Sequence, residues 1–207
     1  MATITLSKTQ SGVLLAHTQQ ATATVTRGSA IDVSTKYSLR YFISLGRSVA
    51  TALTNEVLFR IEGSAKSSGN DEWFPVLQFT SINGKTAATA TTISDASVSA
   101  SDTTFTLASG TGIVSGDFIY LRETGTPANS EWVRVDSISG AVVTCEALTR
   151  NHTDGIAVCD LAERFSGDID CSNLGRIRLV VNSAANASGQ TVDVIGWYVI
   201  LDNATAT

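Results

Sequence analysis

The chain has 207 residues, of which 43% are hydrophobic and 16% charged, and its formal net charge is -5 at pH 7. This apolar share is typical of a globular protein and excludes a chain that is disordered throughout. Lysine and arginine number only 14 and form no cluster, so the sequence lacks the positive surface that direct binding of nucleic acid requires.

Apolar and polar residues alternate along much of the first 80 residues, which predicts β-strands. The clearest case is 37–45, where every second residue is apolar and shares one face. The segments 56–65 and 72–81 repeat the pattern. Pro75 lacks a backbone N–H, so the second of these strands should lie at a sheet edge or carry a bulge.

The composition changes near residue 80. Residues 80–104 are mostly alanine and small polar residues, which indicates a linker or an entry strand into a second module. Four short strands are then predicted, at 104–109, 117–123, 131–139 and 141–148. Turns about ten residues apart are typical of a small barrel or sandwich.

Three glycines, Gly110, Gly112 and Gly116, are spaced almost like a dinucleotide-binding loop. Such a loop needs a helix after its last glycine, so that the helix N-terminus faces the phosphates. The residues that follow, 118–123, are aromatic and β-branched and favour a strand. We therefore predict turns with glycines at positive φ, and a hairpin that pairs 118–123 with 131–137.

Long strand patterns return after residue 160, at 173–184 and 190–202. The second is apolar on both faces from Val194 to Leu201. This pattern predicts a central strand that is buried on both sides.

Neither end of the chain holds enough strands for a two-layer sandwich. We therefore predict an all-β fold, in which residues 1–82 and 158–207 form one β-sandwich of the jelly-roll or immunoglobulin-like kind. A small β-barrel-like domain, 83–157, is inserted in one of its loops, where insertions cost little. Two consecutive domains are the alternative.

Cysteine and histidine are few. Cys145, Cys159 and Cys171 are odd in number and widely spaced, which predicts reduced, buried thiols. A zinc site that adds His152 is disfavoured, because zinc ligands usually come in close pairs. His17 and His152 are the only histidines, and we expect both at the surface, without a nucleophile beside them.

Acidic residues of the second module, among them Glu123, Glu131 and Asp136, could form a catalytic pair only if the fold brought them together. The sequence predicts no catalytic, cofactor-binding or metal-binding residues, and no enzyme. It also contains no signal peptide and no membrane-spanning run, so we expect synthesis in a cytosol and no membrane partner.

Trp73, Trp132 and Trp197 all lie in strand patterns, and a core or half-core role is the default for such residues. If they were exposed, they would suit a sugar-binding platform. A carbohydrate-binding or adhesion module is therefore an alternative function.

The order of segments 30–79, the linker, 112–123 and 130–148 resembles small all-β structural proteins of tailed bacteriophages, which include head decoration (cement) proteins. The resemblance implies a virion protein on the capsid exterior, without a cofactor. Such proteins bind across subunits of the major capsid protein as homo-oligomers, often trimers, and stabilise the shell. A structural protein of the phage tail or neck is the alternative within the virion.

The N-terminal segment 1–22 is a candidate arm that becomes ordered on a neighbouring subunit. Its apolar residues Val13, Leu14 and Leu15 are the candidate partner contacts. An ordinary edge strand of the same sandwich is the alternative.

Overall fold

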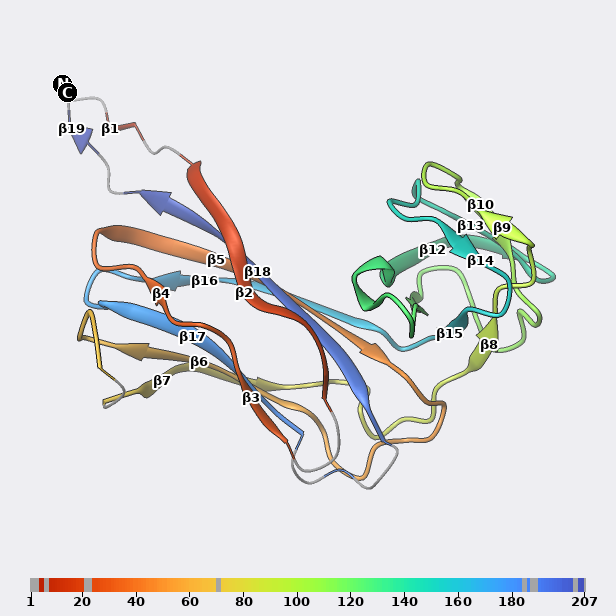
Figure 1. The fold of residues 1–207 in the computed structure, drawn as a ribbon, viewed down its shortest axis with the longest axis horizontal. Coiled ribbons are helices and arrows are strands. Elements are labelled where there is room, and N and C mark those ends of the chain that lie inside the picture. Colours follow the sequence, from red (N-terminus) through yellow and green to blue (C-terminus); the bar gives the residue numbers. More distant parts are fainter. Residues whose placement is uncertain are drawn as a thin grey trace.

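Two β-sheets that lie face to face build the larger part of the molecule, as Figure 1 shows. The structure, a computed structural model, describes residues 4–5, 8–20, 24–69, 72–183, 186, 190–202 and 205–206. The first sheet has four strands, in the order β16 (Glu163–Asp170), β5 (Lys36–Arg47), β18 (Val192–Asp202) and β2 (Lys8–Gln20). The second has five, which are β3 (Val25–Arg27), β17 (Arg176–Asn182), β6 (Leu58–Ser64), β7 (Phe74–Thr80) and β4 (Ile31–Asp32). The predicted all-β, sandwich-like fold is confirmed.

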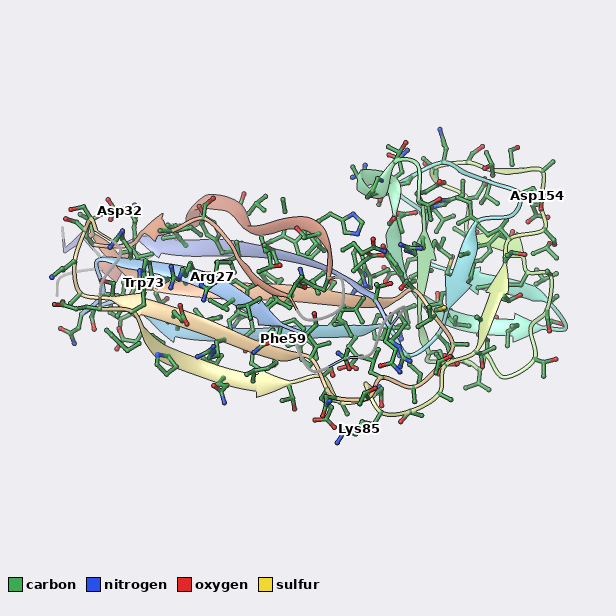
Figure 2. All side chains as sticks on the ribbon, turned by 60° about the horizontal axis from the view of Figure 1, so that its bottom comes forward. Arg27, Asp32, Phe59, Trp73, Lys85 and Asp154 are labelled. Atoms are coloured by element: carbon green, nitrogen blue, oxygen red, sulfur yellow. The ribbon has the colours of Figure 1, made fainter. Side chains whose placement is uncertain are left out.

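The core of the sandwich lies between the two sheets and is filled by every second side chain of the long strands. Ile43 and Leu45 of β5 point into it from one sheet, and Phe59 of β6 and Leu179 of β17 from the other. Figure 2 shows Phe59 within this layer. Each such side chain contributes about 1.5–3 kcal/mol on burial, so the alternating pattern of the sequence is what holds the sheets together.

Strand β7 lies at the edge of the five-stranded sheet and pairs with β6. The register between the two strands shifts where Pro75 stands opposite Glu62. Both features that Pro75 predicted, the edge position and the irregularity, are confirmed, because a residue without an N–H fits where the ladder of hydrogen bonds is interrupted.

Strand β18 lies between β5 and β2, so the predicted central position of 190–202 is confirmed. Its predicted burial on both faces is wrong in part. Trp197 is 40% exposed, and Ile195 and Val199 are only half-buried. These residues point away from the core, toward an outer face that is only partly covered.

Short strands between β7 and β16 form a second body, which we call the second module and define as β8 to β15, residues 90–159. Its strands are β8 (Ala90–Thr92), β9 (Ser97–Val98), β10 (Thr104–Thr106), β11 (Phe118–Arg122), β12 (Glu131–Ser139), β13 (Val142–Cys145), β14 (His152–Thr153) and β15 (Ala157–Cys159). Six of them form a sheet in the order β10, β13, β12, β11, β15 and β8, while β14 pairs with β9. A bridge between Ile93 and Leu107 joins the two edges of that sheet, so the sheet curls around a core of its own.

The predicted hairpin is confirmed, since β11 pairs with β12 across a loop that holds a short 3-10 turn, Pro127–Asn129. Gly112 and Gly116 have φ values of +88° and +95°, as turn glycines should. Gly110 is not among the glycines with positive φ, so that part of the prediction is wrong. Glycine fits at this position because of space, since a Cβ there would lie 2.1 Å from the carbonyl oxygen of Gly140.

The second module stands at one end of the sandwich, and β1 (Ile4–Thr5) pairs with β19 (Thr205–Ala206) beyond the other end (Figure 1). In Figure 2, Asp32 marks the sandwich end, Asp154 marks the far end of the second module, and Lys85 lies on the linker between them. Strand pairing places β15 in the second module. The domain boundaries at residues 82 and 158 stay a prediction.

Candidate functional site

A buried contact between a hydroxyl and a carboxylate joins the second module to the sandwich. The Tyr120 hydroxyl of β11 donates to Oδ2 of Asp193 on β18 at 2.9 Å, and Nε of Arg122 donates to the same oxygen at 2.9 Å. Burial, with the nearby charge of Asp193, raises the pKa of Tyr120. The tyrosine therefore stays a neutral donor to a carboxylate that is itself only 3% exposed.

Two further residues fit closely around the Tyr120 side chain. Its ring covers Gly46 of β5, where a Cβ would lie 2.4 Å from the ring carbon Cγ. Nε2 of His17 lies 3.1 Å from the hydroxyl, and the His17 ring stands edge-on to Trp132 at 5.8 Å. Burial lowers the pKa of His17, although the charge of Asp193 opposes this. The expected surface position of His17 is wrong in part, because the residue is half-buried where β2 meets Tyr120 and Trp132 of the second module.

Buried charges also hold the linker that leads into the second module. Arg47, which is 1% exposed, donates to several linker carbonyls, among them that of Thr86 at 2.9 Å. The carboxylate of Glu163 accepts hydrogen bonds from the backbone N–H groups of Ile82 and Asn83, at 2.7 and 2.9 Å. Burial raises the pKa of Glu163 in spite of these bonds. Arg47 thus holds carbonyl groups of the linker and Glu163 holds N–H groups, and these charge-assisted hydrogen bonds limit its freedom to move.

A histidine between two carboxylates lies inside the second module. His152 is 1% exposed, its Nε2 lies 2.9 Å from Oε2 of Glu131, and its Nδ1 lies 3.4 Å from Oε1 of Glu123. Burial alone would raise the pKa of Glu131, but hydrogen bonds from His152 and from Thr149 together outweigh it and lower that pKa. The expected surface position of His152 is wrong, because pairing of β14 with β9 covers it.

This arrangement suits a structural role, because Glu131 already accepts hydrogen bonds from Thr149 and His152. The buried His152 lines neither of the two hollows at the junction of the bodies. Over the residues that the structure describes, no group of three or more histidine, cysteine or acidic side chains is placed to hold a metal ion. Cys145, Cys159 and Cys171 are buried free thiols, as predicted. Burial raises the pKa of Cys145 and of Cys171 to about 11, so both are protonated at neutral pH.

Two adjoining hollows open where the outer face of the four-stranded sheet meets the second module. The first has a volume of about 480 Å³ and lies over β5, β16 and β18, with Phe42 and Trp197 in its lining. The second has a volume of about 500 Å³ and lies between β18 and β12, with Trp132 and Glu131 in its lining. Trp197 and Arg164 line both hollows, so the two form one continuous cleft.

An apolar row crosses this outer face beside the cleft. The register places Val13 of β2, Trp197 of β18 and Phe42 of β5 next to one another, with exposed fractions of 52%, 40% and 38%. Leu14 and Leu15, the other two candidate partner contacts, are buried in the core of their own sandwich. The register of β2 against β18 shifts here, which turns both leucines inward and leaves Val13 outside. This placement fits the edge-strand alternative.

The three tryptophans have different surroundings. Trp73 lies under the guanidinium groups of Arg176 and Arg178, at 4.9 and 4.0 Å from its ring centre. Trp132 is half-buried, and its ring lies 4.7 Å from that of Tyr120. Trp73 is half-buried as well, so both of these tryptophans fit the expected core or half-core role. That expectation is wrong for Trp197, whose side chain lies on the outer face of the sheet and is 40% exposed.

No family model matches the chain, and no curated protein matches it either. Among solved structures, a chain from the structure of infectious bursal disease virus, Gx strain, aligns with 94% of this chain at 10% identity and a TM-score of 0.24. The alignment covers 40% of that chain, and at this TM-score the likeness carries no argument about fold or function. No helix among the described residues is long and apolar enough to cross a membrane.

Proposed function

We propose that the chain is a non-enzymatic structural protein of a tailed-phage virion. In this proposal it assembles with copies of itself and stabilises the exterior of the capsid by binding across subunits of the major capsid protein. The order of the strand segments, which resembles that of phage decoration proteins, supports the virion assignment. The observation that carries the proposal is the free edge of the five-stranded sheet at β7.

Strand β7 presents an edge without charge. Its sequence, FPVLQFT, contains no charged residue, and it pairs with β6 on one side, with no second partner strand among the described residues. Phe74 and Val76 are 45% and 38% exposed. The unpaired N–H and C=O groups of an edge strand are a template on which another strand can pair.

The other edges of the sandwich carry the protections that natural sheets use against such pairing. Strand β16 contains the charged residues Glu163, Arg164, Asp168 and Asp170. Strand β2 has three register shifts along its length, and β3 and β4 are only three and two residues long. In β7 the proline stands near the N-terminal end, so the stretch from Val76 to Thr80 is left without protection.

A second copy of the chain fits this edge. Two β7 strands that pair antiparallel about a twofold axis bring no like charges together, because neither contains a charge. Such a contact would extend the five-stranded sheet from one copy into the next. It predicts a dimer as the basic unit, rather than the trimer that the resemblance implies.

Quantitative mass spectrometry on purified particles of the encoding phage tests this function. Capsid decoration predicts that the chain is present in fixed proportion to the major capsid protein. A small fixed number of copies would contradict decoration and favour the tail or neck alternative. Absence of the chain from particles would contradict both virion assignments.

A further inference from the structure

We propose that the continuous cleft beside Trp197 binds an acidic oligosaccharide, that is, a chain of sugar rings that carry carboxylate groups. The site lies on the outer face of the four-stranded sheet and does not include β7. This inference therefore goes beyond the proposed function and does not depend on it.

One end of the cleft offers an aromatic platform. Trp197 and Phe42 are neighbours across β18 and β5, both point outward, and both keep more than a third of their surface exposed. The C–H face of a sugar ring packs well on such flat apolar surfaces, which gain dispersion contacts without having to rearrange. Ser44 and Ser166 also line this hollow and supply hydroxyl or backbone groups beside the rings.

The other end of the cleft carries an excess of positive charge. Arg134, Arg150 and Arg164 line the second hollow, together with the two acidic residues Glu131 and Glu146. Glu131 is already engaged by His152 inside the second module. The planar guanidinium group is suited to hold a carboxylate by two parallel hydrogen bonds. This local excess is notable in a chain whose net charge is -5.

Arg164 connects the two ends, because it lines both hollows, and two contacts hold its side chain in place. Its Nη2 donates to the carbonyl oxygen of Trp132, and its guanidinium carbon lies 5.2 Å from the ring centre of Phe118. A side chain that is held in place loses less freedom when a ligand binds. One ligand that spans both hollows would thus meet aromatic rings first, then Arg164, and then Arg134 and Arg150.

The mixture of groups favours a sugar over other anions. Sugar hydroxyls both donate and accept hydrogen bonds, and the second hollow contains guanidinium donors as well as the carboxylate of Glu146. A single-stranded nucleic acid also has rings and negative charge, but it requires a positive track that continues beyond one cleft. The negative charge of the whole chain opposes such a track.

Isothermal titration calorimetry of the full chain with tetragalacturonic acid at low salt tests the site, with neutral maltotetraose as the matched ligand. We expect saturable binding of the acidic sugar, and weaker or no binding of the neutral one.

Trp197→Ala should weaken binding about tenfold, through the loss of the aromatic platform. Arg150→Ala should weaken it by a similar factor, about tenfold, and added salt should weaken it in the wild type. Tyr37→Ala, which removes an aromatic side chain that is 55% exposed elsewhere on the sandwich, is the control and should bind as the wild type does.

Several results would overturn the proposal. They are no binding of the acidic sugar up to about 10 mM, equal binding of the neutral sugar, or unchanged binding by Trp197→Ala when circular dichroism shows that this variant is folded. Tighter binding of a single-stranded oligodeoxynucleotide than of the sugar would show that the cleft binds nucleic acid and not an acidic sugar. None of these results bears on self-association through β7, so the two proposals can fail separately.

Discussion

The hydroxyl of Tyr120 donates a hydrogen bond to the carboxylate of Asp193 across the junction between the second module and the sandwich, at 2.9 Å. Both side chains are buried, and each stands on a strand that has a neighbour on both sides. This contact fixes one body against the other. Because the cleft is lined from both bodies, the same contact fixes the shape of the cleft.

Removal of the Tyr120 hydroxyl should lower the stability of the fold. Tyr120→Phe leaves the buried Asp193 carboxylate with one donor fewer, so we expect the free energy of unfolding to fall by about 1–3 kcal/mol. Tyr37→Phe removes a hydroxyl from a residue that is 55% exposed and should change stability little. Denaturant unfolding of both variants checks this. Equal stability of the two variants would show that the junction contact does not contribute.

The close approach of Tyr120 to β5 gives a second prediction. Gly46→Ala places a Cβ 2.4 Å from the tyrosine ring, which must then move, so we expect a loss of about 1–3 kcal/mol in the free energy of unfolding. Gly125→Ala adds a Cβ that meets no atom within 4 Å and is the matched control. If the two variants unfold alike, the ring does not pack over Gly46 in solution.

The Glu131 carboxylate should make stability depend on pH. Its pKa lies below the ordinary value of 4.5, because hydrogen bonds from His152 and Thr149 outweigh the effect of burial. Its contribution is therefore complete above that value and is lost as pH falls through the folded pKa. Glu131→Gln should lower the free energy of unfolding by about 1.5–3 kcal/mol at neutral pH.

The difference between wild type and Glu131→Gln should shrink as the pH falls below 4.5. Urea unfolding at a series of pH values measures it. Glu146→Gln, at an exposed position, serves as the control and should differ little from wild type. A difference for Glu131→Gln that stays constant down to acidic pH would contradict the assigned role of this carboxylate.

Local patterns of the sequence predicted those features of the fold that depend only on residues close together along the chain. Alternation in 37–45 gave the core-facing side of β5, and the residues after Gly116 favoured a strand and its hairpin. Pro75 indicated the edge strand. Each of these features follows from the geometry of a strand or of one residue, which the sequence contains.

What the sequence could not predict depends on long-range placement. Trp197 stands in a strand that is apolar on both faces, so nothing in the pattern distinguishes its exposed side from its buried one. His152 lies among turn residues, and only the pairing of β14 with β9 buries it. The cleft residues Arg134, Arg150 and Arg164 are far apart in the sequence, and no motif connects them.

Sedimentation velocity of the purified chain tests the central claim, self-association through β7, most directly. We predict a dimer for the wild type and a monomer for Val76→Lys, because two copies would then place charges on the shared edge. Val114→Lys, at a position that is 58% exposed in the second module, should remain a dimer. A wild type that is monomeric at every concentration, or a Val76→Lys variant that still dimerises, would contradict the account.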